Sequence, residues 1–328
     1  MKIAPTVVAV FLCVLTLGRV AQAANTESDL PVWLQERFEP VHYDLTRMVD
    51  NTARNIDQFF GTEDSLFVEN QSFLRVALDT RLQPGDSKLD PSVRFRVDMP
   101  TTKKRLRLII ESDIEEPLGR LSEQGIREVR GGERFDTNNS AVGLEQRSSK
   151  DPKQAWVQGL GLGVKFGAPL DPYLRYSALR QWNFSESKWQ INSSSRVTQF
   201  NQRGLQVRTN FDLNKPLDEE KTLRFQTYAE YEEMRDSTVF SQTAEINRVL
   251  NSRTALRYAV IVVGEDRGEN TIKDYILQAY YRRDIHKNVL FMDIIPEIHF
   301  PTEGNRDPYV ALTFRLEAFF RGNFSRSL

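Results

Sequence analysis

The sequence predicts an all-β protein, an antiparallel up-and-down transmembrane β-barrel of about 12 strands (range 10–14) with a short N-terminal amphipathic helix. Three observations lead to this fold class. Apolar and polar residues alternate along many segments, most of which reach the roughly 9 to 11 residues that a tilted transmembrane strand needs. Arginines recur on the polar faces of these segments, and aromatic residues stand near their ends.

Residues 1–23 have the form of a secretory signal peptide. Lys2 supplies a positive charge, Ala4 to Leu17 form an apolar run, and Ala21-Gln22-Ala23 has the small-x-small form that signal peptidase requires. We expect export, with cleavage after Ala23. A membrane anchor is the alternative, but the apolar run is short for one and Arg19 interrupts it.

Charge and cysteine content exclude several function classes. Cys13, the single cysteine, lies in the signal peptide, so disulfides, a thiol nucleophile and thiolate metal ligands are not expected in the mature chain. An exported chain without cysteine favours a Gram-negative envelope. The formal net charge of −1 gives no basic excess for nucleic acid, and no later apolar run approaches the length of a membrane-spanning helix.

The segment 24–63 is predicted to be a helical periplasmic segment. Its apolar residues recur at three- and four-residue steps, between Pro40 and Gly61. The helix either packs on its own domain or serves as a plug or partner-binding element. The apolar residues are Val41, Leu45, Met48, Val49, Ala53, Ile56, Phe59 and Phe60.

From residue 64 to residue 328 the period changes to two, which predicts the barrel domain. Turn signals such as Pro84-Gly85-Asp86 separate the segments at even spacing, so each strand is expected to pair with the next. The candidates number 13, an odd count, so we expect one to be wrong and predict about 12 strands. The polar segment 113–153 is predicted to be a long loop. The candidate strands are 72–82, 92–99, 104–112, 156–166, 173–182, 188–200, 203–213, 221–234, 238–250, 254–264, 272–284, 289–300 and 308–320.

Alternation alone does not say whether lipid or a second sheet covers the apolar faces. The last segment, PYVALTFRLEAFF, alternates apolar residues and ends in Phe320. It resembles the C-terminal assembly signal of Gram-negative outer-membrane β-barrel proteins, a resemblance to an architecture rather than to one family. The resemblance implies an outer-membrane location, contact with outer-membrane lipid and recognition by the barrel-assembly machinery. The alternative is a soluble periplasmic lipid-binding or scaffold β-protein.

The arginine faces are the main candidate site. Six arginines of the first three strands, interleaved with acids, either bind small anions in the lumen or form an internal salt-bridge network. They are Arg75, Arg81, Arg94, Arg96, Arg105 and Arg107. Elsewhere, the glycines of QGLGLGVKFG (158–167) are expected to clear space in the lumen rather than to bind phosphate.

A weaker candidate is catalytic. Asp293, Glu297 and His299 share one face of the segment 289–300, which suits proton transfer. Two carboxylates and one imidazole are a poor metal set, so we expect neither a metal nor a cofactor. The sequence therefore predicts a narrow channel or a structural envelope protein, with an outer-membrane lipid hydrolase using His299 as the alternative.

Overall fold

The computed structural model describes residues 28–30, 72–100, 106–111, 140–148, 151–268, 271–303 and 305–322. The predicted signal peptide and the amphipathic helix of the segment 24–63 lie outside these residues. Among the described residues, no helix is long and apolar enough to cross a membrane. The described residues form 14 strands: β1 (Ser72–Gln83), β2 (Asp86–Pro100), β3 (Leu106–Glu111), β4 (Ala141–Arg147), β5 (Val157–Lys165), β6 (Asp171–Phe184), β7 (Trp189–Phe200), β8 (Gly204–Pro216), β9 (Lys221–Glu232), β10 (Ser237–Asn251), β11 (Thr254–Glu265), β12 (Ile272–His286), β13 (Leu290–Pro301) and β14 (Tyr309–Gly322).

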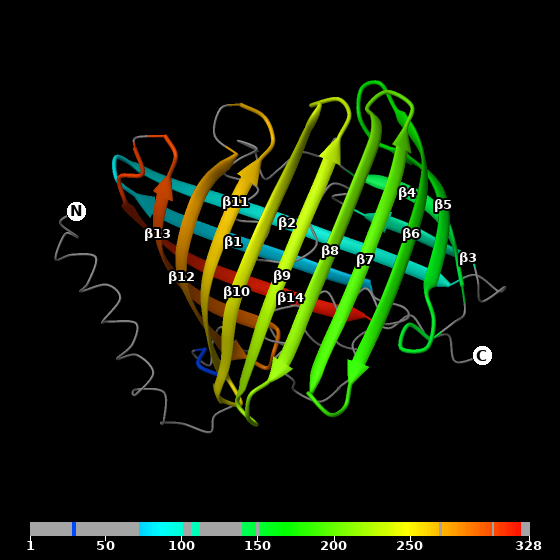
Figure 1. The fold of residues 1–328 in the computed structure, drawn as a ribbon. Helices are drawn as coiled ribbons and strands as arrows, with labels where there is room; N and C mark the ends of the chain where they lie inside the picture. Colours follow the sequence, from blue (N-terminus) through cyan, green and yellow to red (C-terminus); the bar gives the residue numbers. More distant parts are fainter. Residues whose placement is uncertain are drawn as a thin grey trace.

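Each strand pairs antiparallel with the next, as the sequence predicts, and β1 pairs with β14 (Figure 1). The register between β1 and β14 runs from Ser72 opposite Gly322 to Leu82 opposite Leu312. The hydrogen-bonded strand order therefore closes on itself. Because the strand number is even, β1 begins at the same end of the barrel at which β14 ends.

The predicted number of about 12 strands is too low, and 14 is the upper limit of the predicted range. All 13 candidate segments form strands, and β4 adds one more. β4 lies within the segment 113–153, so the prediction of one continuous loop there is wrong. AVGLEQR has only seven residues, with two large apolar side chains, and its alternation is weak. Pairing with β3 on one side and β5 on the other makes it a strand.

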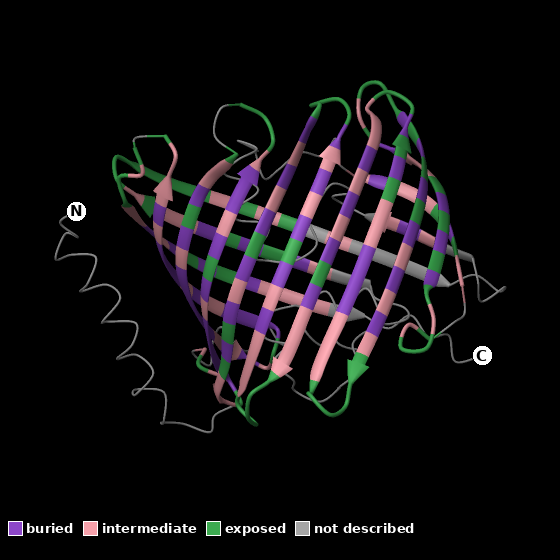
Figure 2. Cartoon of the chain, in the orientation of Figure 1, coloured by how far each residue is buried: buried purple, intermediate pink, exposed green. Residues whose placement is uncertain are grey.

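Buried and exposed residues alternate along the strands (Figure 2). The buried face carries many charged and polar side chains, and the exposed face carries large apolar ones. On β1, Arg75 and Asp79 are buried, whereas Val76 and Leu78 are 41% and 43% exposed. On β5, Leu162 is 62% exposed. A protein that folds in water arranges its strands the other way, with the apolar face covered.

The glycines of β5 lie on the inner face, as expected from the sequence. A Cβ atom at Gly163 would stand 2.5 Å from the Tyr173 hydroxyl oxygen, and one at Gly143 of β4 would also stand 2.5 Å from it. The Tyr173 ring, which comes from β6, therefore lies over two glycines of the neighbouring strands. A side chain at either position would press on the ring, and at Gly163 its Cβ would also stand 2.5 Å from the Val142 carbonyl oxygen.

Candidate functional site

Much of the inner wall of the barrel is built from charged residues that neighbouring strands place opposite one another, beside an apolar cluster on β11 and β12. Adjacent strands lie about 5 Å apart, so an inward arginine reaches a carboxylate on the next strand or the one beyond it. A row of four alternating charges crosses the closing seam: Arg282 on β12, Asp293 on β13, Arg315 on β14 and Asp79 on β1 are successive register partners. We call these four residues the seam row.

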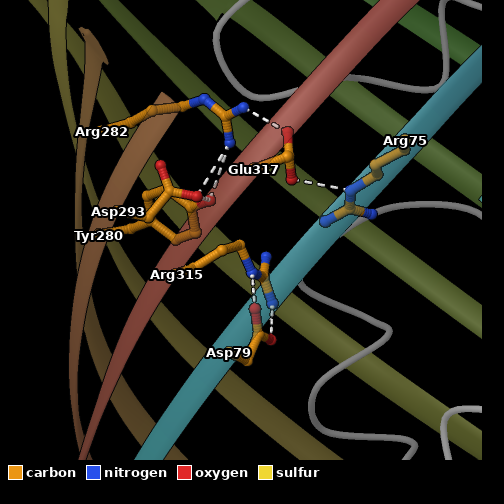
Figure 3. Close-up of polar contacts among 7 residues, drawn as sticks. All are labelled: Arg75, Asp79, Tyr280, Arg282, Asp293, Arg315 and Glu317. Atoms are coloured by element: carbon orange, nitrogen blue, oxygen red, sulfur yellow. Dashed lines mark hydrogen bonds and ion pairs between the residues drawn. The ribbon is translucent and has the colours of Figure 1, made fainter. Parts of the chain in front are cut away.

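The seam row is tightly paired (Figure 3). Arg315 donates two hydrogen bonds to Asp79, from Nε and Nη2, each of 2.7 Å. Arg282 donates to Asp293 over 3.1 Å. Asp79, Asp293 and Arg282 are at most 1% exposed. Charges taken out of water at this depth are stable only with such partners.

Two further residues cross-link the seam row (Figure 3). Glu317 of β14 accepts hydrogen bonds from Arg282 and, over 2.7 Å, from Arg75 of β1. The Tyr280 hydroxyl donates to Asp293 over 2.6 Å. The pairs thus join β12, β13, β14 and β1 on the inside of the barrel, across the strands where the sheet closes.

A second network covers the inner faces of β8 to β11. Arg224 donates to Asp212 over 2.8 Å and to Glu245 over 3.4 Å. Arg257 lies 3.6 Å from Glu245 and donates to Asn247 over 2.9 Å. The residues of both networks on β8 to β12 were not singled out in the sequence. In the sequence, alternation shows that charged residues share one face of each strand. It does not show which residue of another strand each of them pairs with.

The predicted catalytic residues share the inner face of β13, but the structure divides them between two clusters. Asp293 belongs to the seam row. His299 Nδ1 lies 2.7 Å from an Asp274 oxygen, and His299 Nε2 lies 3.2 Å from Arg81 Nη2 and 3.4 Å from Glu297. The ring of Tyr309 stacks on the imidazole, with 4.7 Å between centroids.

These contacts give no support to a serine hydrolase at His299. Nε2 of His299 is already in contact with Arg81 and Glu297. A serine nucleophile needs that same Nε2 as its base. Among the described residues, no group of three histidine, cysteine or acidic side chains is arranged to hold a metal ion.

The structure shows two of the six predicted anion-binding arginines in ion pairs. Arg75 pairs with Glu317, and Arg81 lies 3.4 Å from Glu297. Arg94 stands opposite Arg75 in the register of β1 and β2. The side chains of Arg94, Arg96 and Arg107 lie outside the described residues, as does the whole of Arg105.

A short N-terminal segment, Ser28–Leu30, contacts the rim of the barrel. Asp29 accepts hydrogen bonds from Arg253 over 3.1 Å and from Arg283 over 2.8 Å, and its backbone N–H donates to the Ile285 carbonyl oxygen. Burial raises the pKa of Asp29, but the hydrogen bonds from the two arginines outweigh it and hold the pKa below its usual value. Asp29 thereby ties the segment to two hairpins at the end of the barrel where β1 begins.

No protein-family model and no curated protein matches the chain. Among solved structures, OprB of Pseudomonas putida is similar, with a TM-score of 0.50 and 8% identity over 92% of this chain and 100% of that chain. OccK11 of Pseudomonas aeruginosa has a TM-score of 0.45 and 8% identity over 76% of this chain and 95% of that chain. The chain has the fold of outer-membrane β-barrel proteins. At this identity the likeness concerns the fold alone.

Proposed function

We propose that the chain is an outer-membrane β-barrel protein that forms a narrow channel with a charge-lined wall. One observation carries the proposal: apolar side chains cover the outside of the closed sheet, and ion pairs lie inside it. In water, large contiguous apolar surfaces are rare on monomeric proteins. In a bilayer an outward apolar band is what a spanning barrel requires.

Export and assembly follow from the same proposal. Residues 1–23 direct export and are removed after Ala23, the segment 24–63 lies in the periplasm, and the barrel domain begins near residue 64. Both ends of the barrel sequence lie at one rim, which is the periplasmic rim in bacterial barrels. β14, with Phe320 near its end, is the segment that the barrel-assembly machinery recognises, and outer-membrane lipid surrounds the outer face.

The number of strands, and hence the width of the interior, favours a channel over a closed barrel. Eight strands leave an interior that side chains just fill, and 14 strands enclose a wider one. The inner side chains pair along the wall, between adjacent or next-but-one strands, so Arg75 and Arg81 stabilise the wall.

Purified protein in planar bilayers is expected to give conductance steps for small ions. A complete absence of conductance would leave a structural envelope protein as the function.

The outer face has its own test, with a matched control. Val260, in the middle of β11, and Leu217, in the turn after β8, are both 49% exposed. If lipid surrounds the barrel, Val260→Lys costs about 2–4 kcal/mol, whereas Leu217→Lys at the rim costs about 0–1 kcal/mol. Unfolding by urea from lipid vesicles measures both. Two changes of equal and small size would mean that water covers this face, and would overturn the membrane location.

A further inference from the structure

Three of the four tryptophans of the chain gather at one rim of the barrel. Trp156 directly precedes β5, Trp182 lies near the end of β6, and Trp189 begins β7. Odd-numbered strands begin, and even-numbered strands end, at the rim where β1 begins. These three strands lie side by side in the wall (Figure 1), and the rings of Trp156 and Trp182 meet edge to face with 5.6 Å between centroids.

The three tryptophans belong to the outer face of the sheet. Trp182 shares its face of β6 with Leu174 and Tyr176, which are 55% and 42% exposed. Trp189 shares its face of β7 with the exposed Val197, and Trp156 is itself 40% exposed. Tryptophans at the ends of outward-facing strand segments are typical of the interface between a membrane and water.

Two cations lie on the same outer face, each against a tryptophan ring. The guanidinium carbon of Arg180 is 5.5 Å from the centroid of the Trp182 ring. On β8, Lys215 shares a face with the exposed Phe211, and its Nζ is 5.3 Å from the centroid of the Trp189 ring. We call these two cations and the three tryptophans the tryptophan–cation belt. The ring contacts hold both charges along the outer wall.

The protein itself does not neutralise these two charges. In the part of the chain that the structure describes, neither Arg180 nor Lys215 forms an ion pair, and Arg180 Nε has no hydrogen-bond partner. Their register neighbours are uncharged: Ser193 of β7 stands opposite Arg180, and Leu223 of β9 stands opposite Lys215. A cation on a lipid-facing wall is costly unless an anion or water meets it.

The acids of the two adjoining turns lie at the rim rather than on the outer face of the strands. In the turn between β8 and β9, Asp218 lies 2.7 Å from Lys221, and Glu220 lies 3.6 Å from Arg248. The other acids of these turns are exposed to water; they are Glu186 and Glu219. An anion for Arg180 and Lys215 must therefore come from the surrounding lipid.

We propose that the tryptophan–cation belt binds anionic phospholipid, with Arg180 and Lys215 each holding a headgroup phosphate. A guanidinium group binds phosphate oxygens in a two-point geometry, and an ammonium group binds them as a point charge. The tryptophan rings lie at the depth of the headgroups and so place both cations there. This inference rests on the proposed outer-membrane location and names a class of lipid that contacts β6 to β8.

The test uses the full chain folded into vesicles, in a Trp33→Phe background, so that the fluorescence comes from the three tryptophans of the belt. Brominated acyl chains quench nearby tryptophan. The belt is expected to bind brominated phosphatidylglycerol about fivefold more tightly than brominated phosphatidylcholine. Arg180→Gln combined with Lys215→Gln is expected to reduce this preference to less than twofold. Because each variant is compared with itself in two lipids, a change in tryptophan brightness does not enter.

Arg248→Gln is the matched control, because Arg248 lies near the same rim and pairs with Glu220 rather than with a tryptophan. It is expected to keep the fivefold preference, and heat-modifiable gel migration checks that each variant folds. Equal quenching by the two lipids, or an unchanged preference in the double variant, would overturn the inference and leave the membrane location intact. A preference that inorganic phosphate abolishes at constant ionic strength would assign the site to free phosphate and also overturn the inference. No quenching by either lipid would overturn the membrane location itself.

Discussion

The pair between Asp79 and Arg315 offers the sharpest test of the ionic seam. Asp79→Asn keeps the shape of the side chain and removes its charge. Arg315 then stays buried, with Asp293 as its remaining acidic neighbour in the register. Removing one member of a buried pair costs about 3–5 kcal/mol. Because Asp293 still offsets part of the charge, we expect about 3 kcal/mol for Asp79→Asn.

Urea unfolding of the folded barrel in lipid vesicles, followed by tryptophan fluorescence, measures this loss. With a slope of about 3 kcal/mol per molar urea, the midpoint falls by about 1 M. Asp86→Asn is the control on the same hairpin, because its 3.5 Å pair with Lys88 is exposed to solvent. That change is expected to cost less than about 0.5 kcal/mol.

A double-mutant cycle with Arg315→Met separates the pair from its surroundings. If Asp79 and Arg315 stabilise each other, the double variant loses about 2 kcal/mol less than the sum of the two single variants. Equal midpoints for Asp79→Asn and Asp86→Asn, or strictly additive losses in the cycle, would refute the account of the seam.

Two further predictions concern packing and the N-terminal contact. Gly143→Ala is expected to lower the free energy of unfolding by about 1–3 kcal/mol because the new Cβ meets the Tyr173 hydroxyl. The loss should shrink in a Tyr173→Ala background. An unchanged loss would show that the ring is not the obstacle. The pKa of Asp29 is lower in the folded protein than its unfolded value of 3.8. At pH values above 3.8 the ionised Asp29 therefore stabilises the docked segment Ser28–Leu30, and this stabilisation is lost as the pH falls through the lower folded pKa. Hydrogen exchange of Ser28–Leu30 should rise in that acidic range, and Asp29→Asn should show the same rise already at neutral pH; slow exchange in Asp29→Asn would contradict this reasoning.

Much of the fold could be predicted because alternation is a local property. Arg75 and Asp79 are an even number of residues apart, and each is an odd number of residues from Val76 and Leu78. In any strand, the two charged residues therefore share one face and the two apolar residues share the other. The sequence did not predict β4 because the alternation in this short, glycine-containing segment is too weak. Its neighbours, which the sequence does not place, make it a strand.

The candidate site was less predictable because its contacts join strands far apart in the chain. Asp293, Glu297 and His299 do share one face of β13, yet each meets partners on other strands. Arg282 reaches Glu317 across an intervening strand, and register decides which acid each arginine meets. A shift of one residue would turn every one of these side chains to the other face.

By itself, the sequence determined the all-β fold class and the two chemically opposite faces of the strands, because alternation requires only the geometry of a single strand. The tertiary structure alone decided that 14 strands close the sheet. It also decided that Asp79 and Arg315 meet at the seam while Arg196 and Arg208 stand opposite each other. The physical reason is that ion pairs depend on distances of a few ångströms between strands, and pairing register, which no single segment encodes, sets those distances.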